Sequence, residues 1–235
     1  MDAESDTIAG RVRMVLDGIH RAAIRAGRAP ETVRLMAVSK TVSLERLREA
    51  VDAGIRHVGE NRLQEASPKI EALARPGVAW HFIGTLQRRK VKSVVGRFET
   101  IQSVDSLALA EEIDHRAEEA GLRQRVLLEI NLAGEASKGG FEPAALVAAL
   151  SSLNSLTHLD IRGLMAIPPA GPTAEDARPY FHRLRELAQS LTAQGLGNIN
   201  MQELSMGMSH DYTVAVEEGA TYVRVGTAIF GARRD

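Results

Sequence analysis

Residues 33–59 read VRLMAVSKTVSLERLREAVDAGIRHVG, and they contain the unit from which the fold is predicted. The run at residues 33–39 is mainly apolar and is typical of a buried strand. A helix is expected next, because Ser43 can cap its N-terminus and Gly54 can end it. A short second strand follows at residues 56–59. The stretch therefore predicts a strand–helix–strand unit with parallel strands.

The same alternation continues along the chain, after an opening helix expected over residues 4–26. The six further strand candidates are residues 80–84, 100–103, 126–131, 159–165, 202–205 and 222–226. The helices between them include one near 86–95, one capped by Asp105 and one near 174–194. Eight βα units predict an α/β fold, a single-domain (β/α)8 TIM-type barrel over residues 1–235 with an extra N-terminal helix. A doubly wound open sheet is the alternative.

The composition is that of an ordinary globular protein, and it narrows the classes of function. The chain has 235 residues, and its 29 Lys and Arg nearly balance its 30 Asp and Glu, so nothing suggests a nucleic-acid partner or a membrane-attracted surface. It has no cysteine, which excludes disulfides, thiolate nucleophiles and Cys-based metal sites. No stretch reaches the roughly 18 apolar residues of a membrane span, and the acidic N-terminus is unlike a signal peptide. We therefore expect a soluble, cytoplasmic protein.

Lys40 stands at the end of the first predicted strand, where barrels of this kind place their functional groups. Because it follows an apolar run, we expect it beside a dry interior that disfavours its charged form and lowers its pKa. A neutral amine is what imine formation with an aldehyde requires. The alternative is an ordinary lysine that extends into solvent or pairs with a carboxylate such as Glu129.

Two loops near the end of the chain favour the first interpretation. The sequence Ser205-Met206-Gly207-Met208-Ser209 follows the seventh strand and offers hydroxyls and a glycine, and Gly226-Thr227 follows the eighth. Barrels often bind phosphate with backbone N–H groups of these two loops, although glycine and serine also form ordinary turns. An amine suited to an aldehyde, facing a phosphate site across one rim, describes a site for pyridoxal 5′-phosphate (PLP).

Arg224 lies two residues before Gly226, so both point to the same side of the eighth strand. Its guanidinium could then approach the pyridine nitrogen of PLP. A guanidinium only donates hydrogen bonds, so that nitrogen would stay unprotonated and the ring would be a weaker electron sink. A surface or ion-paired arginine is the alternative.

The seven histidines show no ligand spacing such as His-x-x-x-His, so no metal site is expected. His81, beside Trp80, could line the rim of the barrel. A hydrogen-bonded core histidine is the favoured interpretation.

With these residues assembled, the sequence resembles the pyridoxal phosphate homeostasis protein family (the YggS/PROSC family), whose fold is similar to the N-terminal barrel of alanine racemase. The resemblance extends from about residue 8 to Arg233. The matching stretches are residues 37–41, 59–61 with 64–65, 80–84 with 86–87, 102–105, 163–165 and 205–209. The most specific is VRVGTAIFG at residues 223–231.

The resemblance implies that Lys40 carries PLP as a Schiff base, that Arg224 faces the pyridine nitrogen and that Asn61 lies near the ring. It places Ser205, Ser209, Gly226 and Thr227 around the phosphate. The implied cofactor-binding residues are Lys40, Asn61, Ser205, Met206, Ser209, Arg224, Gly226 and Thr227. Two departures from the family pattern, Arg62-Leu63 and Arg88-Arg89, bear on rim contacts and surface charge more than on cofactor attachment.

Alanine racemases resemble this barrel but add a C-terminal β-domain that supplies a catalytic tyrosine. This chain ends at Asp235, and none of its tyrosines (Tyr180, Tyr212 and Tyr222) is visibly placed as a second base. Racemisation needs an acid or base on each face of Cα, and only Lys40 can be named. We therefore expect a non-catalytic protein of intracellular PLP homeostasis that supplies or sequesters PLP. Its candidate partners are apo PLP-dependent enzymes, and it is expected to be a monomer or weak dimer. A PLP-dependent amino-acid racemase of low activity is the alternative.

Overall fold

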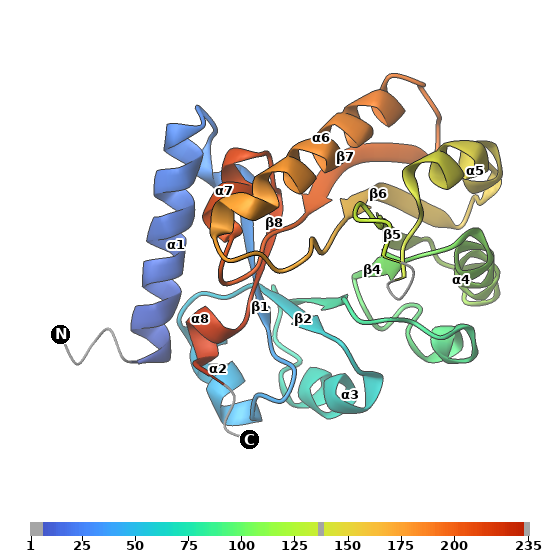
Figure 1. The fold of residues 1–235 in the computed structure, drawn as a ribbon. Helices are drawn as coiled ribbons and strands as arrows, with labels where there is room; N and C mark the ends of the chain where they lie inside the picture. Colours follow the sequence, from blue (N-terminus) through green and yellow to red (C-terminus); the bar gives the residue numbers. More distant parts are fainter. Residues whose placement is uncertain (1–6, 136–138, 233–235) are drawn as a thin grey trace.

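The structure, a computed structural model, describes residues 7–135 and 139–232 and contains a closed barrel of eight parallel strands (Figure 1). The strands are β1 (Arg34–Val38), β2 (His57–Glu60), β3 (Ala79–Phe82), β4 (Thr100–Val104), β5 (Gln124–Glu129), β6 (Leu159–Met165), β7 (Ile199–Ser205) and β8 (Tyr222–Val225). Each strand pairs with the next along the chain, and β8 pairs back with β1. This closure confirms the barrel prediction and excludes the open sheet.

Helical segments connect the strands and surround the barrel (Figure 1). They are α1 (Ile8–Arg25), η2 (Pro30–Thr32), α2 (Leu44–Asp52), α3 (Leu63–Ala72), η3 (Arg88–Ser93), α4 (Leu107–Glu119), α5 (Pro143–Ser155), η4 (Ala174–Ala177), α6 (Arg178–Thr192), α7 (Tyr212–Glu217) and α8 (Thr227–Phe230). The extra N-terminal helix is confirmed as α1, which packs beside α7 and α8; residues 4–6 of the expected helix lie outside the described residues. Ser43 caps α2 as predicted, accepting a hydrogen bond from the Arg46 N–H.

Three helix predictions need correction. The segment expected near 86–95 is the short 3₁₀ helix η3, in which only Val91 is buried, so it lacks the apolar face that holds a longer helix on the barrel. The helix expected over 174–194 is divided into η4 and α6, because Pro179 in the first turn of α6 has no N–H to continue the preceding turn.

The third correction concerns the N-cap of α4, which is Ser106 and not Asp105. The Ser106 backbone is extended, and its side chain accepts a hydrogen bond from the Leu109 N–H at 3.4 Å. The Asp105 carboxylate instead accepts a hydrogen bond from the Ser106 hydroxyl at 2.9 Å. Aspartate and serine are both good N-caps, so residue type alone does not distinguish them, and the local backbone conformation decides which one caps the helix.

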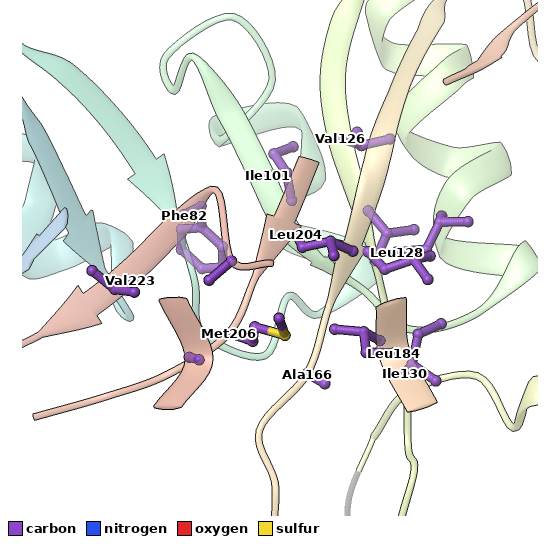
Figure 2. Packing of buried hydrophobic residues seen from close by; sticks show 14 of the residues in the cluster. Phe82, Ile101, Val126, Leu128, Ile130, Ala166, Leu184, Leu204, Met206 and Val223 are labelled. Atoms are coloured by element: carbon purple, nitrogen blue, oxygen red, sulfur yellow. The ribbon is translucent and has the colours of Figure 1, made fainter. Parts of the chain in front are cut away.

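The hydrophobic core joins the strands to the helices around them, and Figure 2 shows part of it, with Val126 and Leu128 of β5 and Leu184 of α6. Burial of these side chains holds the helices on the barrel. The fully buried side chains also include polar ones, among them Gln102, His81 and Ser205. No helix in the described part of the chain is long and apolar enough to cross a membrane.

Candidate functional site

A pocket of about 330 Å³ opens at the end of the barrel where the strands have their carboxyl ends. Its polar lining consists of Lys40, Asn61, Ser209, His210, Arg224, Gly226 and Thr227. Its apolar lining consists of Val38, Ile83, Ile167 and Met208. A few convergent polar groups over apolar walls are typical of a small-molecule site.

Lys40 lies in a tight turn directly after β1. The turn is closed by a hydrogen bond of 3.0 Å from the Val42 N–H to the Ser39 carbonyl. Lys40 is half-buried, and Val38 and Ile83 line the same pocket. The first strand therefore delivers the lysine to the pocket as predicted; the lowered pKa of its amine stays a prediction.

Arg224 forms part of the pocket wall although its residue is only 4% exposed. Its Nη1 donates to the Ser205 hydroxyl at 2.7 Å, and its Nη2 donates to the Ala166 carbonyl at 2.9 Å. Burial lowers the pKa of Arg224 to about 10, opposed by the charges of Glu129 and Asp211. The guanidinium is thus held rigidly and stays charged at neutral pH.

A chain of side-chain hydrogen bonds extends from Arg224 through the barrel. The Ser205 hydroxyl donates to Gln102 Oε1 at 2.7 Å, and Gln102 Nε2 lies 3.4 Å from His81 Nδ1. His81 Nε2 lies 3.0 Å from His57 Nδ1. Arginine can only donate, so each later group must accept from the one before it and donate to the next.

That direction requires both histidines to be neutral, with Nδ1 as the acceptor. Burial, together with the charge of Arg34, lowers the pKa of His57 to about 4. Burial also lowers the pKa of the fully buried His81, and the neighbouring His57 and Arg125 add to the effect. The preferred interpretation of His81 as a hydrogen-bonded core residue is confirmed.

The two loops predicted to bind phosphate meet at Ser209. Its hydroxyl oxygen accepts from the Gly226 N–H and from the Ala228 N–H, each at 3.2 Å. Two backbone N–H groups and one hydroxyl therefore converge at the edge of the pocket. An anion that replaced the Ser209 oxygen as acceptor would find these two N–H groups and the hydroxyl directed toward one point.

Glu129 is a titratable group close to this end of the barrel. Burial raises the pKa of its carboxyl, the charge of Asp105 raises it further, and Arg224 opposes the shift. No group of three or more His, Cys, Asp or Glu in residues 7–135 and 139–232 is placed to hold a metal ion.

Comparison with known proteins adds to this geometry. The alanine racemase N-terminal domain family matches residues 19–234. A pyridoxal phosphate homeostasis protein of Aquifex aeolicus is 46% identical over 224 residues, covering 95% of this chain and 97% of its own length. The protein of the same name from Pseudomonas aeruginosa is 46% identical over 230 residues and covers 97% of this chain and 96% of its own length. The chain belongs to the pyridoxal phosphate homeostasis protein family.

A solved structure of a family relative gives the same fold. PipY of Synechococcus elongatus, determined with PLP bound, is 42% identical and superposes with a TM-score of 0.82, covering 96% of this chain and 100% of its own. Alanine racemase of Clostridium difficile has a TM-score of 0.69 at 16% identity, and this chain spans 57% of its length. The second likeness shows the fold alone.

Six of the eight residues predicted for the site line the pocket: Lys40, Asn61, Ser209, Arg224, Gly226 and Thr227. The other two do not. Ser205 is fully buried, and its hydroxyl lies between Arg224 and Gln102. Met206 packs its side chain in the hydrophobic core (Figure 2) and its N–H donates to the Tyr222 carbonyl. The phosphate role implied for Ser205 is not supported by this geometry.

Five further residues line the pocket without having been predicted as site residues: Val38, Ile83, Ile167, Met208 and His210. Ile167 follows the end of β6, so the strand-end rule that selected Lys40 would also have selected it. Met208 and His210 flank Ser209 in the β7–α7 loop. The two departures from the family pattern lie at the surface, where the side chains of Arg62 and Arg88 are 74% and 65% exposed.

Proposed function

We propose that this protein binds PLP in the barrel pocket through Lys40 and acts in intracellular PLP homeostasis by holding and releasing the cofactor. The observation that carries the proposal is the convergence of Lys40, Arg224 and the Ser209–Gly226 pair on one pocket. The PLP-bound relative PipY and the names of the curated relatives support it. Bound PLP supplies an aldehyde that forms a Schiff base with an amine.

The described residues fit the polar groups of PLP. Lys40 provides the amine. The Ser209 hydroxyl can donate to the phosphate, and the Gly226 and Ala228 N–H groups can do so where a phosphate oxygen replaces the Ser209 oxygen as their acceptor. Asn61 Oδ1 is buried without a hydrogen-bond partner in the described chain. A buried acceptor without a donor is destabilising, so a ligand donor at this position would satisfy it.

Arg224 determines which protonation state of the pyridine nitrogen the site favours. Its guanidinium is fixed by Ser205 and the Ala166 carbonyl, and it can only donate. It therefore favours a ring nitrogen that carries no proton. A ring in that state stabilises a carbanion poorly, which suits a protein that retains the cofactor without turning over a substrate.

The low-activity racemase is the second candidate, and His210 is the observation in its favour. Tyr222 lies against His57 and His81, at the other end of the hydrogen-bond chain from Arg224, and none of the three tyrosines lines the pocket. His210 does line it. A racemase mechanism would need Lys40 and His210 to act on opposite faces of Cα.

The decisive experiment is the absorption spectrum of the purified protein with added PLP. Lys40→Ala should lose the visible band of the Schiff base, whereas Lys92→Ala, at an exposed lysine of η3, should retain it. Borohydride reduction and peptide mass analysis should place the label on Lys40. A wild-type protein that stays colourless, or a label on another lysine, would refute the attachment.

Two further assays separate holding from turnover. Optical rotation of L-alanine should stay constant with the PLP-loaded protein; a loss that requires both Lys40 and His210 would favour the racemase. Mixing the PLP-loaded protein with an apo PLP-dependent enzyme should restore that enzyme's activity, while the absorption band of the Schiff base on Lys40 declines. Retention of the band and no restored activity would argue against a supply role.

A further inference from the structure

The turn that carries Lys40 has an unusual backbone. Among the described residues, Thr41 is the only non-glycine residue with a positive φ, at 63°. Lys40 and Thr41 are the two central residues of the turn that the Val42-to-Ser39 hydrogen bond closes, and of these only Thr41 has a positive φ. This pattern corresponds to a type II turn, in which glycine is favoured at the second central position. A β-branched residue is strained there, and such strain persists only where the surroundings hold it.

Helix α3 supplies those surroundings on the carboxyl side of Lys40. Glu65, in its first turn, accepts a hydrogen bond from the Thr41 N–H at Oε2, at 2.9 Å. A carboxylate that accepts from a backbone N–H forms one of the stronger hydrogen bonds. Glu65 thus fixes the strained residue directly after the lysine.

The same helix fixes the residue directly before Lys40. Lys69 Nζ donates to the Ser39 carbonyl at 2.6 Å and to Glu60 Oε1 at 2.6 Å. The Ser39 hydroxyl donates to the same Glu60 oxygen, also at 2.6 Å. Glu60 is fully buried and the Lys69 side chain is 10% exposed, so these bonds are well shielded from water.

We propose that Glu65 and Lys69 are positioning residues that clamp the Ser39–Val42 turn and so direct the Lys40 amine into the pocket. Neither side chain lines that pocket; each acts through the backbone on one side of Lys40. The inference rests on the proposed function in one respect, that Lys40 is the attachment residue.

The test uses the full-length protein and PLP as the probe. Glu65→Ala should slow formation of the Schiff-base band and weaken PLP binding, each by roughly tenfold, the factor expected for one charge-assisted hydrogen bond. Glu65→Gln should retain most of the wild-type rate, because its amide oxygen can still accept from Thr41. Glu71→Ala, at an exposed position of the same helix, is the matched control and should be unchanged.

A rescue separates positioning from a general structural role. Glycine adopts positive φ without strain, so Thr41→Gly added to Glu65→Ala should restore the rate of band formation. Equal rates for wild type and Glu65→Ala would overturn the proposal, and so would a double variant as slow as Glu65→Ala. Lys69→Met, which removes the donor to the Ser39 carbonyl, should also slow band formation. Lys69 is buried, whereas the Glu65 side chain is 28% exposed, so the Glu65 variants remain informative if Lys69→Met fails to fold.

Amide hydrogen exchange measured without PLP tests the clamp independently of whether Lys40 binds PLP. The Thr41 amide should exchange roughly tenfold faster in Glu65→Ala than in wild type, with Glu71→Ala unchanged. If wild type forms no Schiff base on Lys40 but this exchange difference appears, the clamp stands and the attachment fails. If Lys40 is labelled and exchange at Thr41 is unaffected, the clamp fails alone.

Discussion

Ser205→Ala should destabilise the protein strongly although it removes a single oxygen atom. That hydroxyl is fully buried, accepts from Arg224 Nη1 at 2.7 Å and donates to Gln102 Oε1 at 2.7 Å. An alanine methyl group can do neither. The substitution therefore leaves a buried guanidinium N–H and a buried amide oxygen without partners.

The magnitude follows from these two bonds. A hydrogen bond to a charged group contributes about 1.5–3 kcal/mol, and an orphaned buried acceptor costs about 1–3 kcal/mol. The two effects share one atom and do not add fully. The free energy of unfolding should therefore fall by about 3 kcal/mol, a large fraction of the roughly 5–15 kcal/mol of a typical native protein.

Urea unfolding provides the assay, because Trp80 is the only tryptophan and lies buried in β3. With an m-value of about 3 kcal/mol/M, the midpoint should fall by about 1 M while the slope is unchanged. Ser190→Ala is the matched control: its hydroxyl donates to the Leu187 carbonyl on an exposed face of α6, and its effect should stay within about 0.5 kcal/mol. A Ser205→Ala effect as small as that of the control would refute the hydrogen-bond chain as a source of stability.

Two further predictions concern sterics and pH. Gly84→Ala would place a Cβ 2.3 Å from the Asn61 carbonyl oxygen, so it should displace Asn61 and weaken PLP binding by roughly tenfold; Gly197→Ala, with no atom within 4 Å, should leave the measured Kd unchanged. His57 has a pKa of about 4 when folded and near 6.5 when unfolded, so the unfolded chain binds more protons between these values. The stability is complete above the unfolded pKa and is lost as pH falls toward about 4. Because the ring is partly exposed, the loss from about pH 7 to about pH 5 should be about 1–2 kcal/mol larger in wild type than in His57→Gln, measured by urea unfolding at both pH values; equal losses would contradict the shift.

The strands, the helices and the residues at the strand ends could be predicted because they depend on short, local stretches of sequence. Strand ends are set by short apolar runs, and a parallel barrel brings all of them to one rim, so Lys40 and Arg224 were found by position alone. The contacts of Ser205, Gln102 and Glu65 depend on which side chains meet across the barrel or across a turn. No local pattern encodes those pairings, so the contacts of Ser205 with Arg224 and Gln102, and the contacts of Glu65 with the Lys40 turn, were not predicted.

The α3 clamp and the Ser205–Gln102 chain act on the site in the same physical way, although they share no residue. Lys40 and Arg224 both have long, flexible side chains, and holding either side chain in one orientation costs conformational entropy. The cost is met before the ligand arrives, by the α3 clamp for Lys40 and by the Ser205–Gln102 chain for Arg224. A site ordered in advance binds more tightly than a flexible one with the same groups. For a protein that holds a reactive aldehyde, the lysine makes attachment possible, and the rigidity of these supports sets how fast and how tightly the aldehyde is held.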